Sequence, residues 1–287
     1  MKKFLIAVFI IAVIATFGYY KYERAENLKK GVPVLMYHNI FNGDISSSKS
    51  GVLITPQNFE RQMMYLKNHG YETITVEQLY DFMKYGKMLP KKPIMITFDD
   101  GYLGNYEYAY PLFKKIGYKG IINVIVKNVP SQTNKVVTPY LHFDWAKAKE
   151  MASSGVIEIE SHTYNSHMYK KSKNADIPML SGPININGRL ETMNEYKNRI
   201  KEDLYKAKKD IEDNTGKNVT ALAYPYGIGS ETSKDVAASL GYKVIFTMIE
   251  GVNRYKDDPY AVKRITVRNS DSGEDIVKKI EKYKRMH

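Results

Sequence analysis

The chain has 287 residues, of which 43% are hydrophobic, so it can bury a substantial core, and α/β barrels of this length commonly form one domain. It contains no cysteine, which excludes disulfides, a thiolate metal site and a lipidated cysteine, so any metal must be bound by nitrogen and oxygen ligands. The formal net charge of +12 is spread along the chain without a phosphate-binding glycine loop, a zinc finger or an RNA-binding aromatic signature, so nucleic acid is not expected as a partner.

The N-terminus has the organisation of an export signal. A Met-Lys-Lys start precedes an apolar run over residues 4–18, after which the sequence turns polar. No Ala-x-Ala cleavage site precedes that boundary, so we expect residues 1–28 to be a signal peptide or a retained N-terminal anchor, and residues 29–287 to form one domain. The protein is expected to be secreted or held at the cell surface. Its basic charge indicates either a solvated surface or attraction to an anionic cell wall or membrane surface.

Short β-rich runs alternate with amphipathic helical stretches through the rest of the chain, the pattern of βα units around a parallel sheet. Helix starts are indicated by Thr55-Pro56 and by the capping-box pair Thr75 and Gln78. Eight strands are expected, which favours an α/β fold with a closed or nearly closed barrel. They are predicted at residues 32–38, 72–76, 93–99, 120–126, 156–161, 220–224, 243–248 and 262–267.

Two long polar segments interrupt this alternation, residues 41–54 and 168–190, and both are rich in Gly, Ser, Asn and Pro. Each follows a histidine, His38 or His167. Long loops in a compact domain are usually functional or disordered. We expect these two to form the rims of a substrate groove, and the alternative is a pair of mobile insertions.

Two predicted strands end in residues that can carry out chemistry. Asp99 and Asp100 stand at the end of one strand and are followed by Gly101, while His162 follows the strand at 156–161. Successive strand residues point to opposite faces, so the two carboxylates can converge only where the strand ends and the backbone turns. Active residues of parallel barrels lie at the C-terminal ends of the strands, which is where these side chains fall.

A second histidine, His167, follows His162 by five residues. Helical residues at that spacing lie about 140° apart, so the two cannot form a helical zinc pair and must lie on a loop. With Asp100 they can make a three-ligand set that leaves a position open for water and a substrate oxygen, although on the sequence alone Asp99 and Asp100 could exchange roles. One divalent ion is expected, with Zn²⁺ favoured, although Co²⁺, Ni²⁺ and Fe²⁺ accept the same ligands.

These residues carry a resemblance to a known family. Thr97–Asp100, His162-Thr163 with His167, and Tyr224–Gly227 resemble the motifs of the polysaccharide deacetylases of carbohydrate esterase family 4, the NodB-homology group. The resemblance covers roughly residues 32–270 and implies a distorted (β/α) barrel with about seven or eight parallel strands.

Several details are similar to one branch of that family. Most members place the second histidine four residues after the first, where this chain has Ser166. The longer spacing, the run Val34–His38 ahead of the first motif, and the lack of an arginine before Tyr224–Gly227 are similar to the branch that deacetylates poly-β-1,6-N-acetylglucosamine, a biofilm exopolysaccharide. That branch looks circularly permuted, so a circularly permuted NodB-like barrel is expected.

The resemblance implies roles for the site residues. Asp99 would be the general base, while Asp100, His162 and His167 would hold a divalent ion that polarises the acetyl carbonyl and lowers the pKa of water. The family arginine that tethers the base stands two residues before the motif proline, where this chain has Ala223, so the tether of Asp99 is left open.

Expulsion of an amine requires a general acid, because an unprotonated amide anion is a very poor leaving group. In most family members the acid is a histidine near the C-terminus, but this chain has Arg264–Val267 there, and His38 fits the permuted motif. The backbone N–H of Tyr226 is implied to help stabilise the oxyanion.

The expected function is extracellular N-deacetylation of an N-acetylglucosamine polymer, with poly-β-1,6-N-acetylglucosamine favoured. Peptidoglycan, chitin-like oligomers or O-acetylated xylan are the alternative substrates of the same site. A non-catalytic polysaccharide-binding adhesion protein is the alternative of another class, although the chain keeps every candidate ligand.

Overall fold

A single curled sheet forms the centre of the computed structural model, which describes residues 1–45, 52–131 and 140–286. Its strands are β1 (Val32–Tyr37), β4 (Glu72–Thr73), β5 (Pro93–Asp100), β6 (Gly120–Val124), β7 (Ile157–Ser161), β12 (Ala221–Ala223), β13 (Val244–Phe246), β14 (Val252–Asn253) and β15 (Ile265–Thr266). Their order is β13-β12-β7-β6-β5-β1-β14, with β15 beside β1 and β4 beside β5. All eight predicted strands are confirmed, most of them shorter than expected.

The sheet closes almost completely into a barrel. Every pairing within it is parallel except that of β1 with β14, a strand that the sequence did not predict. Phe246, at the end of β13, forms an isolated parallel bridge with Val262, and the chain then enters β15 next to β1. The predicted parallel barrel is therefore confirmed, and its seam is this single bridge.

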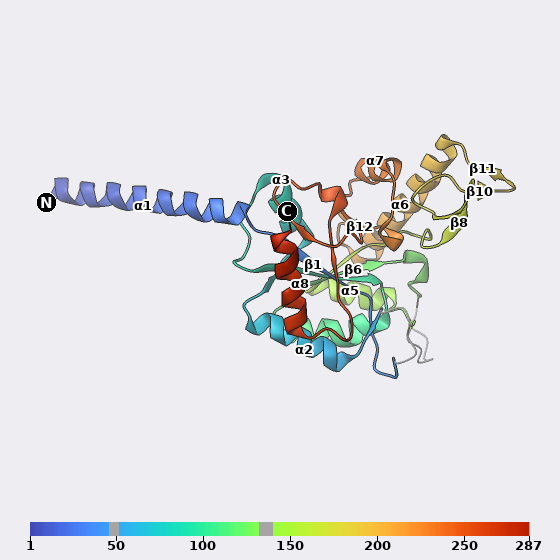
Figure 1. Cartoon of the computed structure of the whole chain (residues 1–287), viewed down its shortest axis with the longest axis horizontal. Coiled ribbons are helices and arrows are strands. Elements are labelled where there is room, and N and C mark those ends of the chain that lie inside the picture. The colour runs from blue at the N-terminus through green and yellow to red at the C-terminus, as the bar shows by residue number, and fades with distance from the viewer. Residues whose placement is uncertain (46–51, 132–139, 287) are drawn as a thin grey trace.

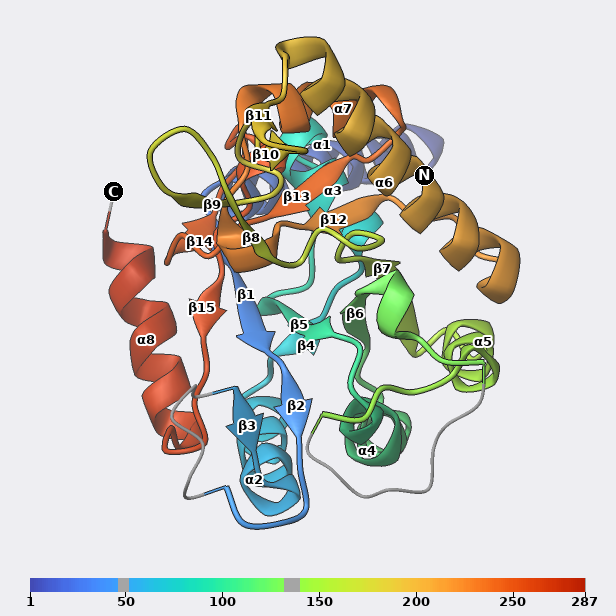
Figure 2. The same ribbon diagram turned by 90° about the vertical axis from the view of Figure 1, so that its right-hand side faces the viewer.

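Helices surround the barrel, as Figure 2 shows for α2, α4, α5, α6 and α8. Thr55 accepts a hydrogen bond from the Asn58 N–H at the start of α2, and Thr75 and Gln78 form the expected capping box at the start of α3. The helices of this part of the chain are α2 (Pro56–Asn68), α3 (Val76–Tyr85), α4 (Tyr110–Ile116), α5 (Trp145–Ser153), α6 (Met193–Thr215), α7 (Glu231–Ser239) and α8 (Gly273–Arg285), with short turns η1 (Asn105–Ala109), η2 (Val126–Asn128), η3 (Pro225–Gly227) and η4 (Pro259–Ala261).

The strands are apolar throughout because both of their faces are buried. Along β1, Val34 belongs to one hydrophobic cluster and Leu35 to another. The first cluster fills the barrel interior and includes Leu79 and Phe82 of α3, and the second, with Phe98, packs between the sheet and the outer helices. A polar side chain inside the barrel is cut off from solvent and must find its hydrogen-bond partners among other buried groups. The site described below contains such side chains.

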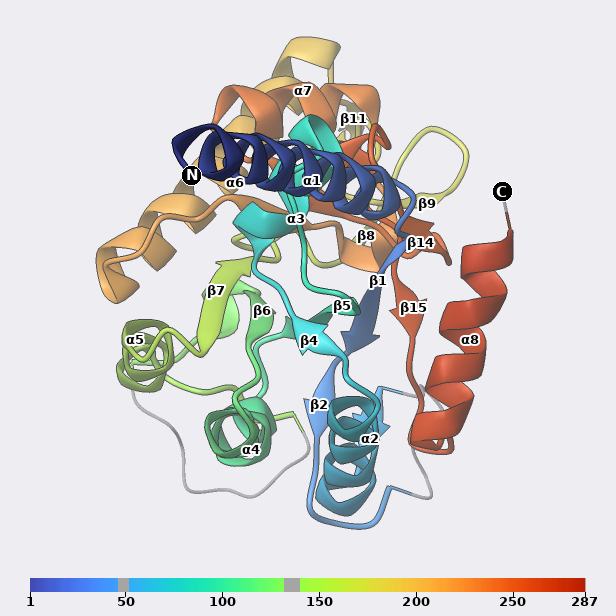
Figure 3. The same ribbon diagram turned by 90° about the vertical axis from the view of Figure 1, so that its left-hand side faces the viewer.

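A long helix, α1 (Lys2–Leu28), projects from the barrel (Figures 1 and 3). Its last turn is attached through Asn27, which is fully buried, donates from Nδ2 to the Lys87 carbonyl at 3.1 Å, and accepts from the Leu89 N–H at 2.9 Å. From Phe4 to Leu28 the helix is long and apolar enough to cross a membrane, judged by length and composition, a test that a signal sequence also passes.

Residues 168–190, predicted as a long loop at the rim of a groove, contain regular structure, and their role as a rim stays a prediction. The segment contains two small antiparallel hairpins, β8 (Tyr169–Lys171) with β9 (Asp176–Pro178) and β10 (Asn185–Ile186) with β11 (Arg189–Leu190). The second hairpin turns at Asn187 and Gly188, whose φ angles of 52° and 84° are those of a type I′ turn.

The other long segment, residues 41–54, is described only in part, because residues 46–51 lie outside the described residues. At its two ends, β2 (Asn39–Ile40) pairs in parallel with β3 (Leu53–Ile54). Whether the segment forms a groove rim stays a prediction.

Candidate active site

The two aspartates at the end of β5 face different partners because the backbone turns at the second of them. Asp100 has φ = 74°, in the left-handed region that non-glycine residues rarely adopt, and Gly101 follows with φ = 84°. The turn thus begins one residue earlier than the glycine indicated. Asp99 keeps the orientation of a strand residue and lies in the barrel interior, while Asp100 is directed toward the two histidines.

Asp100, His162 and His167 form one cluster, as predicted. The Oδ1 atom of Asp100 lies 3.5 Å from Nε2 of His162 and 3.6 Å from Nε2 of His167, and one ligand atom from each residue lies within 4.8 Å of the others. Oδ1 of Asp100 is also a buried oxygen without a hydrogen-bond partner among the described residues.

The cluster fits a divalent ion. An ion with tetrahedral bonds of about 2.0–2.1 Å separates its ligand atoms by about 3.3 Å, close to both distances from Asp100. A bound cation would also satisfy the buried oxygen, which is otherwise costly to leave without a partner. Two imidazoles and a carboxylate are a common donor set for Zn²⁺ and neighbouring transition metals.

The orientation of His162 suits it to bind a metal. Nδ1 lies 2.8 Å from the carbonyl oxygen of Ala223, to which it can donate, and this leaves the lone pair of Nε2 directed toward Asp100. Burial lowers the pKa of His162, although the charges of Asp99 and Asp100 oppose that change. The imidazole is therefore kept neutral, which is the protonation state that a metal ligand requires.

The tether of Asp99 is an arginine that sequence reasoning missed. Arg264, fully buried, donates from Nη1 to Oδ1 of Asp99 and from Nη2 to Oδ2, both at 2.8 Å, and its Nε donates to the Thr247 carbonyl. Nδ2 of Asn123 donates to Oδ1 of Asp99 at 2.8 Å. Burial by itself would raise the pKa of Asp99, but the charge of Arg264 and its hydrogen bonds hold that pKa well below its usual range.

Replacing Arg264 by methionine should remove the influence that lowers the pKa of Asp99. Asp99 would remain buried without its cation, at a cost of about 3–5 kcal/mol in the free energy of unfolding, and its pKa would rise because only the burial effect would remain. In the wild type the pair contributes stability above pH ~4 that is lost as pH falls through the depressed pKa of Asp99. Thermal unfolding and a pH–rate profile should show a lower Tm and an acidic limb moved to higher pH.

Arg264→Lys is the matched variant, because it keeps the charge and loses the two-pronged geometry. It should fall between the wild type and Arg264→Met in both measurements. An acidic limb that stays in place in Arg264→Met would show that the ionisation of Asp99 does not depend on the arginine.

His38 stands where the sequence predicted, directly after β1. The register of β1 and β5 pairs Tyr37 with Phe98, so His38 and Asp99 are the next residues of neighbouring strands. A positive charge on His38 would lower the pKa of Asp99, so the imidazole lies within electrostatic reach of the carboxylate. On the far side of β1 lies β15, the strand from the C-terminal segment in which no histidine was found.

Tyr226 lies beside the metal-type cluster. Its backbone has φ = 59° within η3, and its ring centroid is 4.7 Å from that of His167 and 4.5 Å from that of Tyr169. A backbone N–H in the first turn of a helix has no partner within the helix, so the N–H of Tyr226 is suited to an external acceptor. Tyr169 brings the β8–β9 hairpin to the same place.

A second buried acid lies on β7, two residues before His162. Oε2 of Glu160 accepts hydrogen bonds from the backbone N–H groups of Thr220 at 2.8 Å and Ala221 at 2.7 Å, at the start of β12. Burial raises the pKa of Glu160 to about 8, against the opposing effect of those hydrogen bonds. Sequence reasoning did not single out this residue.

Glu160 should therefore contribute less to the stability of the metal-free protein as pH rises. The pKa of Glu160 is higher in the folded state than in the unfolded state, so its contribution is complete below pH ~4.5 and is lost as pH rises through about 8. Glu160→Gln keeps an oxygen for the two N–H groups and cannot ionise. In chelator, its Tm should fall less between pH 5 and pH 9 than that of the wild type, with exposed Glu202→Gln as control. If Tm changed equally with pH in the wild type and in Glu160→Gln, the titration of Glu160 would not contribute to stability.

A nearly closed parallel barrel that carries two carboxylates and two histidines at the C-terminal ends of its strands has the architecture of a barrel enzyme, with a cluster that could hold a metal ion. A family model described as polysaccharide deacetylase matches residues 86–245, more than half of the chain. The protein belongs to the polysaccharide deacetylase family, hydrolases that act on N-acetyl amide bonds of polysaccharides.

Individual relatives agree with this membership. A poly-β-1,6-N-acetyl-D-glucosamine N-deacetylase of Escherichia coli (strain K12) is 25% identical over 265 residues, which cover 87% of this chain and 38% of the relative. The Staphylococcus aureus (strain MRSA252) enzyme of the same name is 27% identical over 239 residues, covering 82% of this chain and 74% of the relative. The chain thus spans well under half of the length of the first relative.

The fold is also found among solved structures. The de-N-acetylase from Aggregatibacter actinomycetemcomitans matches with a TM-score of 0.77 and 25% identity, covering 88% of this chain and 100% of that one. The predicted NodB-like barrel is therefore confirmed at the level of the fold.

Proposed function

We propose that this protein is a metal-dependent N-deacetylase of poly-β-1,6-N-acetyl-D-glucosamine that acts outside the cell membrane. The observation that carries the proposal is the cluster of Asp100, His162 and His167 with a tethered carboxylate, Asp99, on the neighbouring position. Two relatives that share most of this chain's length carry the name of that activity.

The residues divide the reaction between them. Asp100, His162 and His167 would hold the ion, which when bound supplies Lewis-acid polarisation of the acetyl carbonyl and acidification of water. Asp99, ionised because of Arg264, accepts the proton of the attacking water.

The leaving group is protonated by His38, which follows β1, the strand that pairs with the Asp99 strand β5. His38 donates a proton to the departing glucosamine nitrogen as the C–N bond breaks, giving acetate and a free amine. The N–H of Tyr226 donates to the oxyanion that forms at the acetyl carbonyl oxygen when water attacks.

Defined oligomers test the reaction and the linkage together. The purified full-length protein in detergent should release acetyl units from β-1,6-linked N-acetylglucosamine oligomers in the presence of Zn²⁺ or Co²⁺, as a mass loss of one acetyl group per event. Chelator should stop the loss. A mass loss confined to β-1,4 oligomers would assign the site to chitin-like or peptidoglycan substrates, and none on any oligomer would favour a binding protein.

The proposed location is the cell surface. The apolar stretch of α1 can serve as an export signal, and the net charge of +12 favours an anionic wall or membrane surface. If residues 1–28 are removed on export, washing intact cells with high salt should release the protein, because attraction between surface charges is screened within a few ångströms at molar salt. Retention in salt together with release by detergent would show that α1 is kept as an anchor.

A further inference from the structure

On one side, the loop that carries both histidines, residues 162–167, is held by one carboxylate of helix α6. Asp203 accepts hydrogen bonds from the backbone N–H of Tyr164 at 2.9 Å through Oδ2, and from the N–H of Asn165 at 2.9 Å through Oδ1. Its Oδ1 also accepts from the hydroxyl of Ser166 at 2.8 Å. Three consecutive loop residues thus bind one side chain from a different element.

The same loop has a conformation that needs support. Thr163 has φ = 75°, in a region that is unfavourable for a β-branched residue, and such backbone strain persists only where surrounding contacts fix it. On the side of η2, the N–H groups of Val126 and Lys127 donate to the carbonyls of Thr163 and Tyr164 at 3.1 and 3.0 Å. Asp203 supplies the support on the opposite side.

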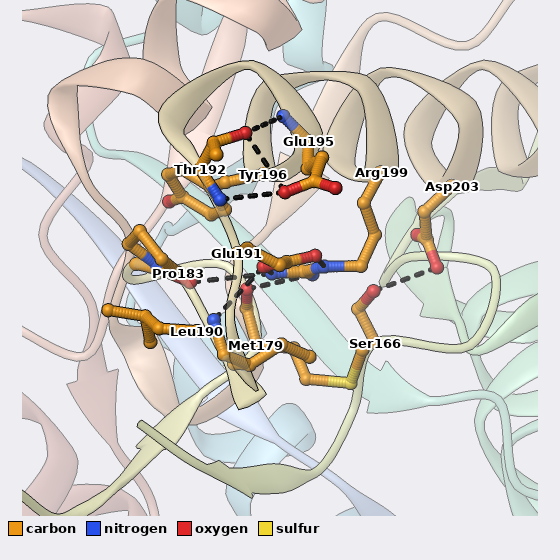
Figure 4. A network of polar contacts seen from close by, with 12 residues as sticks. Ser166, Met179, Pro183, Leu190, Glu191, Thr192, Glu195, Tyr196, Arg199 and Asp203 are labelled. Atoms are coloured by element: carbon orange, nitrogen blue, oxygen red, sulfur yellow. Dashed lines mark hydrogen bonds and ion pairs between the residues drawn. The ribbon is translucent and has the colours of Figure 1, made fainter. Parts of the chain in front are cut away.

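These contacts determine which position of the loop reaches the metal-type cluster. Figure 4 shows the side chain of Ser166 directed to Asp203 on α6. The next side chain, His167, has its Nε2 atom 3.6 Å from Oδ1 of Asp100. Position 166 is the one that would hold a histidine at a four-residue spacing, and here it is occupied by the contact with α6.

We propose that Asp203 is a positioning residue for the metal site. It fixes the loop so that the fifth residue after His162 becomes the third ligand, and it preorganises both imidazoles before the ion binds. The inference rests on the proposed metal-dependent function, because it concerns how the ligands of that metal are arranged.

Helix α6 also offers a matched control, because the same face fixes the segment that follows the loop. Arg199 pairs with Glu191 at 2.7 Å (Figure 4) and donates to the Met179 carbonyl. The hydroxyl of Tyr196 donates to the Leu180 carbonyl at 2.7 Å. Tyr196→Phe therefore removes the hydrogen bonds of this hydroxyl to Leu180 and Ser230 without changing any contact to residues 162–167.

The primary test is metal affinity of the metal-free protein, measured with Zn²⁺ against a chromophoric chelator. Asp203→Asn presents an amide N–H₂ where one oxygen accepted, so Zn²⁺ affinity should fall about 10- to 100-fold, the range found when groups supporting metal ligands are removed. The absorption spectrum of bound Co²⁺ should change with it. Tyr196→Phe should leave both unchanged, even where its Tm falls as much as that of Asp203→Asn.

Two further tests ask whether Asp203 influences Zn²⁺ affinity through its contact with Ser166. Ser166→Ala should lower Zn²⁺ affinity less than Asp203→Asn, and the double variant should show less than the sum of the two losses in free energy, because both remove the same contact. The double replacement Ser166→His and His167→Ser should bind Zn²⁺ no better than His167→Ala, since position 166 faces α6.

The outcomes separate this inference from the proposed function. Wild-type Zn²⁺ affinity in Asp203→Asn, or recovery of Zn²⁺ binding in the histidine-shifted variant, would overturn the role of Asp203 while leaving deacetylation intact. Absence of acetate release by a wild type whose Zn²⁺ affinity still depends on Asp203 would overturn the function alone.

Discussion

Alanine at Asp100, His162 or His167 should remove bound metal and deacetylation together. Three protein ligands leave no redundancy, and the two histidine nitrogens share one carboxylate oxygen at 3.5 and 3.6 Å, so losing any one dismantles the set. Metal content after purification should fall to the level of a chelated sample, and acetate release should fall to background. Retention of the far-UV circular dichroism spectrum separates this from unfolding.

Asp99→Asn is the contrasting variant at the neighbouring position. It removes the proton acceptor but none of the proposed ligands, so metal content should stay near that of the wild type while turnover falls about 10²- to 10⁴-fold. Loss of the ion in Asp99→Asn would exchange the roles of the two aspartates. Full metal occupancy in His167→Ala would refute the five-residue ligand spacing.

His38→Ala should keep its metal and lose turnover on the amide by about 10²- to 10⁴-fold, the contribution of one acid–base group. This loss of turnover depends on the leaving group, because a glucosamine nitrogen must be protonated as the C–N bond breaks. An activated aryl acetate has a leaving group that needs little protonation, so the same variant should lose much less activity on it.

Both substrates should be measured on one preparation, so that the ratio of the two losses is independent of the fraction of folded enzyme. Equal losses would indicate that His38 supports the fold or the metal. Near wild-type turnover on the amide would mean that another residue donates the proton and that the strand ahead of the first motif does not carry the acid.

The sequence was sufficient to predict where the residues of the short motifs lie in the fold. The strand that ends in Asp99 and Asp100 and the strand that ends before His162 are both confirmed, and the two histidines lie on a loop as their spacing required. The parallel barrel rule then predicted their meeting, because the carboxyl ends of neighbouring parallel strands meet at one edge.

Arg264 could not be predicted from a motif, since it is 165 residues from Asp99 and reaches it only because β15 lies beside β1 and β1 beside β5. A signal was nevertheless present. Arg264 precedes the β-branched run of a strand, and an arginine is almost never fully buried without an acidic partner.

The two hairpins within residues 168–190 were not predicted, because the segment was judged by its composition and not by its turn residues. Asn187-Gly188 is the strongest short-range hairpin signal, because both central positions of a type I′ turn need φ > 0. Its flanking strands, β10 and β11, have two residues each and are exposed, so they show no alternation of apolar and polar residues that could have marked them.

Arg264 has a second role at the bridge between Phe246 and Val262 that closes the barrel. The residue lies at that seam, where its N–H donates to Ile249, its Nε to Thr247 beyond β13, and its two Nη atoms to Asp99 on β5. One side chain therefore fastens the two edges of the sheet and holds the carboxylate. Because Arg264 contacts both sides of this seam, we expect opening of the barrel wall to be coupled to release of Asp99, and amide hydrogen exchange at Thr247 and Val262 should be faster in Arg264→Met than in the wild type.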